Sequence, residues 1–394
     1  MKEKTNLVRN RCLFSIVIVV IYFLCHRIPL NGIDMNVYDN LSLDLDAILT
    51  MAISGAGKKC YVMSLGISPY ITASLIVSIL FAMRTKEVKM RTSPKAMNYW
   101  ITGLSFIIAL IQSIFYALEL TYVNRNLTSI ILAVFELMAG ASIAQYLLIN
   151  NKKYGVGGFA PIIVVNMFET LIRTLTKSTF VALRIPLLIS LVMVIIMIFM
   201  EMHEKKIPLQ RVSVNNVHAE KNYLAIKYNP VGFMALMFGS GIYMIPQLII
   251  GIIHHYHQTA IINFLYENLN MSTVFGMRIY IVMMFAFTIL LSLLFVNPKD
   301  LSEDLLQSGD SIVNVPAGKP TRRYIRKWVL LLSCVSGAVV CGCLILCAYL
   351  QFNGIVDPTV AMLPTTFMLL SGFICNIYLE IRAYHDFDSY KPFV

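Results

Sequence analysis

Ala52–Met83 reads AISGAGKKCYVMSLGISPYITASLIVSILFAM and has two parts of different character. Its beginning, Ser54 to Gly57, is rich in glycine, and glycine costs a helix roughly 1 kcal/mol per residue relative to alanine. From Tyr61 about 20 apolar or small residues follow without a charge, which is long enough to span a membrane. We therefore expect a short, easily displaced segment in front of a firm transmembrane helix. An ordinary loop before a span is the alternative interpretation.

The composition places the whole chain in a membrane. Of its 394 residues, 58% are hydrophobic and only 13% are charged, and the mean hydropathy is +0.71. A soluble globular protein has an apolar fraction near one half and about one quarter charged residues, so that class is excluded. The net charge of +11 could indicate nucleic acid binding, but in a membrane protein it more often reflects basic cytoplasmic loops.

Apolar runs predict ten transmembrane helices joined by short connections. They are expected at about 13–30, 61–83, 98–120, 127–149, 157–176, 183–200, 229–253, 274–296, 328–350 and 360–384. Most of the 32 lysine and arginine residues fall in alternate connections, which predicts a multi-pass protein of the cell membrane with both termini cytoplasmic.

Signals for catalysis or cofactor binding are weak. Gly57 and Lys58 suggest a phosphate-binding loop, but the required spacing fails because Ala52 replaces glycine and Lys59 replaces serine or threonine. Three histidines at 254–257 stand without a second ligand cluster and are interpreted as a solvated loop. We predict no enzymatic activity, no cofactor and no metal.

Four polar residues fall within or near the expected spans, where such groups are functional candidates by default. None belongs to a repeated pair or relay, so packing or partner contact is at least as good an interpretation. These residues are Glu136, Gln145, Asn166 and Glu169.

Several stretches resemble the SecY family of protein-conducting channels, in the family's sequence order. Leu65 to Ser74 (LGISPYITAS) is similar to its second helix, and the end of the first helix is matched by RIPLNGID at 27–34. NPVGFM at 229–234 resembles the start of the seventh helix. NPKDLSEDL at 297–305, followed by Gly309 and Gly318, matches the large loop between helices eight and nine. Gly155 to Gly158 is only a partial match to a glycine-rich sequence before helix five.

This resemblance implies an all-α membrane protein of ten transmembrane helices in two pseudo-symmetric halves of five. Residues 1–180 would form the first half with a plug-like segment at 48–60, and 181–394 the second with protruding loops at 201–228 and 297–327. The implied function is that of the central channel subunit of a preprotein translocase. It would move unfolded polypeptide across the membrane and open sideways between helices two and seven.

The resemblance also assigns candidate site residues. The apolar pore ring would comprise Ile71, Leu75, Val164, Phe168, Met237 and Leu369. The plug would comprise Ser54, Gly55, Ala56, Gly57, Lys58 and Lys59. The residues that contact a motor would be Lys205, Lys206, Arg211, Lys319, Arg322 and Arg323.

Where this sequence departs from the usual family pattern, it resembles the channel of the accessory Sec system of Gram-positive bacteria, which exports serine-rich glycosylated adhesins. Pro316 stands where most members have an arginine that matters for the SecA motor, and proline carries neither charge nor N–H donor. The implied partners are a dedicated SecA-type ATPase, small SecE-like and SecG-like subunits, the exported preprotein and the bilayer. The alternatives are a housekeeping SecY channel and, less favoured, a secondary transporter, which should show broken helices and coordinating groups near the midplane.

Overall fold

The computed structural model describes residues 5–33, 60–84, 88, 91–124, 126–211, 222–231, 234–239, 243, 246, 250, 253–254 and 259–389. The chain divides into two compact units. Unit 1 comprises Met1–Ser78, Ser93–Leu188 and Gly354–Val394, and unit 2 comprises Ile79–Thr92 and Ile189–Asn353. The predicted plug residues Ser54 to Lys59 lie outside the described residues.

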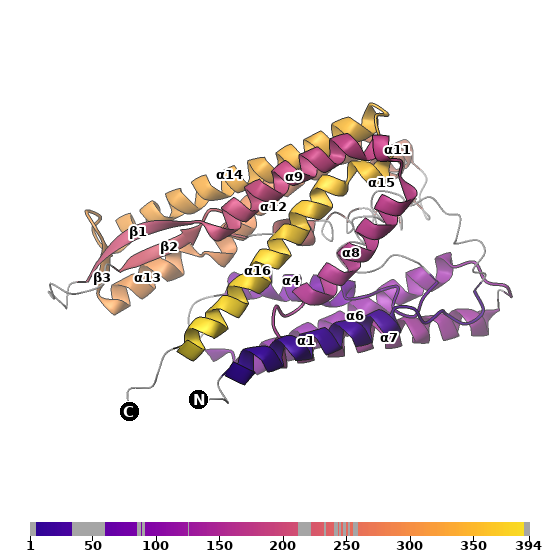
Figure 1. Cartoon of the computed structure of the whole chain (residues 1–394), viewed down its shortest axis with the longest axis horizontal. Helices are drawn as coiled ribbons and strands as arrows, with labels where there is room; N and C mark the ends of the chain where they lie inside the picture. Colours follow the sequence, from indigo (N-terminus) through magenta and orange to yellow (C-terminus); the bar gives the residue numbers. More distant parts are fainter. Residues whose placement is uncertain are drawn as a thin grey trace. The chain divides into compact units, whose positions relative to one another are not determined.

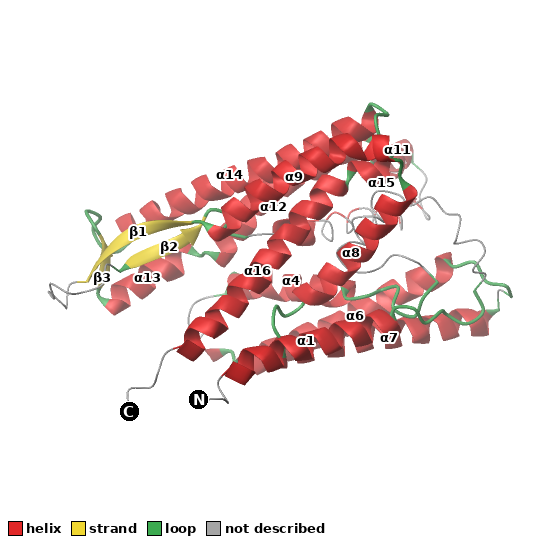
Figure 2. Cartoon of the chain, viewed as in Figure 1, coloured by secondary structure: helices red, strands yellow, loops and turns green. Residues whose placement is uncertain are grey.

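Long apolar helices dominate the described chain (Figure 2). Seven of the described helices are long and apolar enough to cross a membrane, and Ser68–Ala82 is apolar but shorter. Every predicted span other than 229–253, which is described only in part, overlaps a described helix.

Unit 1 is a bundle of helices from both ends of the chain. Helix α1 packs against α7, α8 and α16, while α6 packs along α7 and α8 along α16 (Figure 1). The bounds are α1 Thr5–Cys25, α4 Ser68–Ala82, α6 Pro94–Glu119, α7 Leu127–Tyr154, α8 Ala160–Lys177, α15 Pro358–Ala361 and α16 Leu363–Ser389. The two contact units therefore do not coincide with residues 1–180 and 181–394, because the last helix packs with the first. The division of the chain at these residues stays a prediction.

The entry to α4 is fixed by pairing with the segment that follows α1. The Leu30 N–H donates to the Cys60 carbonyl at 2.9 Å, and the Val62 N–H donates to the Ile28 carbonyl at 2.9 Å. Gly140 of α7 lies against this segment so closely that a β-carbon there would clash with the Val62 carbonyl. A buried apolar cluster that includes Leu65 surrounds the pairing. The start of the second predicted span is thus held by backbone bonds and close packing.

Unit 2 contains two long helices that pack tightly along each other, α12 (Val274–Phe295) and α14 (Lys319–Phe352). Small residues allow the approach: a β-carbon on Gly337 would lie 3.1 Å from the Phe285 ring. Helix α9 (Phe180–Met202) enters the unit from Ile189 onward, and α11 (Ala260–Asn268) packs on α12.

A small folded region stands at one end of these helices, and we call it the platform (Figure 1). It consists of β1 (Glu204–Arg211), β2 (Tyr223–Lys227), α13 (Pro298–Ser308), β3 (Asp310–Ile312) and the first turns of α14. The strands form an antiparallel sheet in the order β2-β1-β3, with Ile207 opposite Leu224 and Leu209 opposite Ile312.

The platform has its own apolar core, which explains why polar connections fold here. One buried cluster contains Ile207 and Ile226 from the sheet, Leu305 from α13, and Ile325 and Val329 from α14. The region 297–327 is not an extended loop, because α13 and β3 fill it and α14 begins at Lys319 instead of Trp328.

An ion pair joins the hairpin to α9. Lys227 lies 3.5 Å from Glu201, whose side chain is only 4% exposed, and the Tyr228 N–H donates to the His203 carbonyl at 3.1 Å. Only the Glu201 carboxylate is buried, so removing Lys227 would leave a buried charge without this partner at the contact between the sheet and the helix end.

Candidate functional site

Three helices of unit 1 carry the predicted pore residues of that unit. Ile71 and Leu75 are one turn apart on α4 and both are buried. Because residues four apart share a helix face, these two side chains occupy one stripe. Leu369 lies on α16, the helix against which α8 packs, and is 1% exposed.

Helix α8 combines apolar and polar faces. Val164 and Phe168 are again four residues apart; Val164 is half-buried, whereas Phe168 is 47% exposed. The exposed Glu169 follows Phe168, while Asn166 is 4% exposed and donates to the Tyr22 hydroxyl of α1 at 3.2 Å. The helix is thus anchored on one face and leaves the Phe168 side chain accessible within its own unit.

Met237, the remaining predicted ring residue, belongs to unit 2. It lies in the helical stretch 234–239 and is 2% exposed.

The first turns of α14 present a basic face. Lys319, Arg322 and Arg323 are exposed, and the opposite side of the helix buries Thr321, Ile325 and Val329. Spacings of three and four residues continue this face to two further exposed cations, Arg326 and Lys327. Sequence reasoning did not include these two among the motor contacts. Their spacing of three and four residues from Arg322 and Arg323 places them on the same face, but only if the helix is known to begin at Lys319.

Two predicted motor-contact lysines of β1 lie over aromatic rings. The Lys205 ammonium is 4.7 Å from the centre of the Trp328 ring, and that of Lys206 is 4.6 Å from the Tyr223 ring. Such contacts attract a cation by roughly 0.5–1 kcal/mol at exposed sites, so both charges are held in place at the sheet surface. The backbone of Arg211 pairs with Asp310 of β3.

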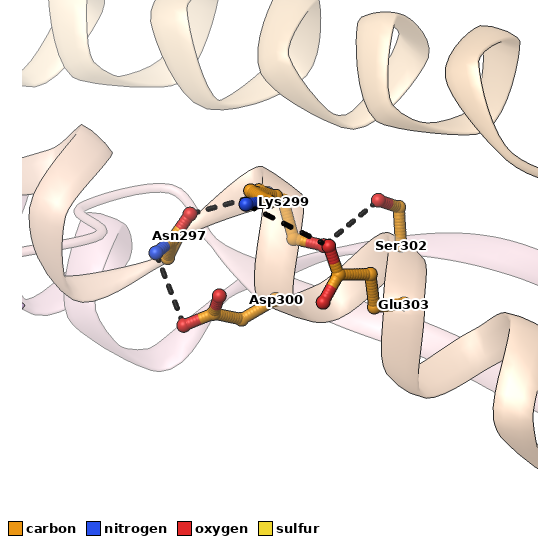
Figure 3. Close-up of polar contacts among 5 residues, drawn as sticks. All are labelled: Asn297, Lys299, Asp300, Ser302 and Glu303. Carbon is orange, nitrogen blue, oxygen red and sulfur yellow. Dashed lines mark hydrogen bonds and ion pairs between the residues drawn. The ribbon is translucent and has the colours of Figure 1, made fainter. Parts of the chain in front are cut away.

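Helix α13 is capped at both ends, which fixes where it begins and ends. The Asn297 carboxamide oxygen accepts from the Lys299 N–H at 3.1 Å, and its amide donates to Asp300 at 3.0 Å (Figure 3). Ser302 donates to the Lys299 carbonyl at 2.8 Å. At the other end, Gly309 adopts a left-handed conformation with φ of 73°. These caps explain why the NPKDLSEDL motif forms a short, stable helix under the sheet.

The turn before α14 is also built locally. The Thr321 hydroxyl donates to the Pro316 carbonyl at 2.8 Å, and Gly318, at φ of 92°, precedes the helix. Pro316 is exposed on this turn, a few residues before the basic face.

Three of the polar residues noted within or near spans make internal contacts. Glu136 accepts from the backbone N–H of Asn31 at 3.1 Å and from its side chain at 3.0 Å. Gln145 accepts from Ser105 at 2.9 Å, and Asn166 binds Tyr22 as described. These contacts agree with the packing interpretation.

Comparison with known proteins identifies the fold. A solved structure described as a protein conducting channel superposes with a TM-score of 0.66 at 16% identity, covering 96% of this chain and 93% of that one. Sec61 in the canine ribosome-channel complex gives a TM-score of 0.59 at 14% identity, again covering 96% and 93%. The chain therefore shares the fold of these solved channels, and seven of its described helices are long and apolar enough to span a membrane.

The family model described as SecY matches residues 61–378. The chain belongs to the SecY family. A protein of Streptococcus agalactiae serotype Ia named accessory Sec system protein translocase subunit SecY2 is 28% identical over 390 residues, covering 96% of this chain and 94% of the relative. One of the same name from Staphylococcus haemolyticus is 26% identical over 405 residues, covering 99% and 98%.

Proposed function

We propose that this chain is the channel subunit of an accessory Sec system, through which unfolded serine-rich polypeptide crosses the cell membrane. The observation that carries the proposal is the similarity, over nearly the full length, to relatives named accessory SecY2. The sequence departures at Pro316 and before helix five support the same branch.

The energy for transport comes from a cytoplasmic SecA-type ATPase that docks on the platform. Five exposed cations lie on one face of α14, and Lys205 lies over Trp328 of the same helix, which together give a basic surface. Lys206 follows on β1 and faces the other side of the sheet, over Tyr223. Such a surface steers an acidic partner and fixes its register. Small SecE-like and SecG-like subunits complete the translocase.

The resting channel is sealed by apolar side chains and by the plug. A narrow hydrophobic constriction excludes water and blocks ions while still parting for a peptide. The apolar side chains that unit 1 contributes to the seal are Ile71, Leu75, Val164, Phe168 and Leu369. Unit 2 contributes Met237. The segment Ser54 to Lys59 closes the channel from outside.

Depleting this chain in its host tests the assignment to the accessory branch. We expect secretion of serine-rich glycoproteins to fall while the bulk of secreted proteins is unaffected, because a separate housekeeping channel serves them. The measurement compares both classes in culture medium and cell wall by quantitative proteomics. A general secretion defect would identify a housekeeping channel instead.

The orientation follows from the charge bias, with the platform and both termini in the cytoplasm. A cysteine at Lys319 should then resist a membrane-impermeant thiol reagent in intact cells, and one at Asn124, in the exposed connection between α6 and α7, should react. Labelling after permeabilisation controls for accessibility. Reaction of the Lys319→Cys variant in intact cells would reverse the topology.

A further inference from the structure

The connection from α7 to α8 is short and buried. Helix α7 ends at Tyr154 and α8 begins at Ala160, and Gly155, Val156 and Gly157 between them are buried. Buried backbone groups must find hydrogen-bond partners, and here most of the partners come from side chains of other helices.

Ser15 of α1 and Asn151 of α7 satisfy the middle of this connection. The Val156 N–H donates to the Ser15 hydroxyl at 2.8 Å, and that hydroxyl donates to the Asn151 carboxamide oxygen at 2.8 Å. The Asn151 amide donates to the carbonyls of Gly158, at 2.5 Å, and Val156, at 3.2 Å. Asn151 is fully buried, so each of its bonds is expensive to lose.

The glycines make room for these bonds. A β-carbon on Gly155 would clash with the Asn151 carboxamide oxygen and the Ser15 hydroxyl. Gly157 has φ of 76°, a left-handed conformation that a side chain disfavours, and a β-carbon there would meet Ile377 of α16. The partial glycine motif is therefore explained by local geometry.

Helix α16 closes the arrangement. The Gly157 N–H donates to the Glu380 carboxylate at 2.9 Å, which is a charge-assisted bond at the start of α8. One turn from Ser15 on α1 and one turn from Glu380 on α16, a second contact joins these two helices. The Arg11 guanidinium donates to the Tyr384 hydroxyl at 2.8 Å and lies 4.5 Å from the centre of its ring. Helices α1, α7 and α16 thus converge on the beginning of α8.

We propose that Ser15, Asn151 and Glu380 form a clasp, a set of positioning residues that holds the start of α8 and so sets the resting closure of the channel. Val164 lies one turn into α8, about 6 Å along the helix axis from Ala160, so a shift at the clasp moves the predicted ring residues of α8. This inference rests on the proposed role of Val164 and Phe168 in the seal.

Substitutions at Glu380 and at Asn151 test the clasp. Glu380→Gln keeps an oxygen that accepts the Gly157 N–H, whereas Glu380→Ala removes it. Asn151→Asp still accepts from Ser15 but loses both donors to the carbonyls of Val156 and Gly158. In proteoliposomes without motor or cargo, we expect Glu380→Ala and Asn151→Asp to raise ion leak per folded channel about tenfold, and Glu380→Gln to remain close to the unsubstituted protein.

Glu136→Ala is the matched control, because this carboxylate also accepts a backbone N–H but lies elsewhere on α7. Leak is normalised to folded protein, measured by thermal unfolding in detergent, so that lost stability alone does not count. Val164→Ser with Phe168→Ser tests the seal separately. Unchanged leak in the clasp variants with raised leak in the ring variants would overturn the clasp and leave the seal intact. Unchanged leak in both sets would overturn the ring assignment, and the clasp inference with it.

Discussion

Reversing the charge of Arg322 and Arg323 to glutamate should reduce ATP-driven export about tenfold or more, because two attractive contacts with the motor become repulsive. Both side chains are exposed, whereas the core residue Ile325 is buried, so the substitutions leave the side chains of the platform core unchanged. The measurement is protease protection of cargo in inverted membrane vesicles supplied with the accessory motor and ATP.

The matched control is Arg382→Glu, an exposed arginine near the end of α16 whose side chain is 61% exposed. It reverses one charge instead of two, in the other unit, and replaces an exposed ion pair with Asp386 by a like-charge pair. Export should stay within about twofold, because exposed ion pairs contribute little. Pro316→Arg is expected to improve coupling to a housekeeping SecA by supplying a charged donor on the turn before the basic face. Export that survives reversal of Arg322 and Arg323 would remove this face from the docking site.

The helical membrane fold could be predicted from the sequence because membrane spans are encoded locally. About 20 apolar residues without a charge have few alternatives to a transmembrane helix, so the expected spans overlap described helices wherever the structure describes them. The start of α14 was not predicted, because local hydropathy detects only the apolar part of a helix. Residues 319–327 are basic and resemble a loop by hydropathy, yet Ile325 and Val329 share a stripe that packs in the platform core.

The clasp could not have been predicted, because its partners are far apart in sequence. Ser15 and Asn151 are separated by 136 positions, and Gly157 and Glu380 by 223. Single serine, asparagine and glutamate residues carry no periodic signal. Only the convergence of α1, α7 and α16 on one connection reveals that these side chains act on the same backbone.

The predicted ring illustrates a different limit. Apolar residues are so frequent in this chain that most positions in a span satisfy the requirement for an apolar side chain. The structure separates them by environment: Ile71, Leu75 and Leu369 are buried, while Phe168 remains 47% exposed beside Glu169. An exposed aromatic side chain on α8, next to the exposed Glu169, is the feature that best suits contact with a passing polypeptide.

Site-specific photocrosslinking from position 168 tests whether the exported polypeptide passes along α8. A photoreactive amino acid replaces Phe168, and a second variant carries it at Phe106 of α6, which is 51% exposed in the same unit. An export substrate is stalled by a folded domain at its end, and the adducts are compared after irradiation. We expect a strong adduct with the stalled substrate from position 168 and none from position 106. No adduct from position 168, or equal adducts from both positions, would contradict passage of the polypeptide along α8.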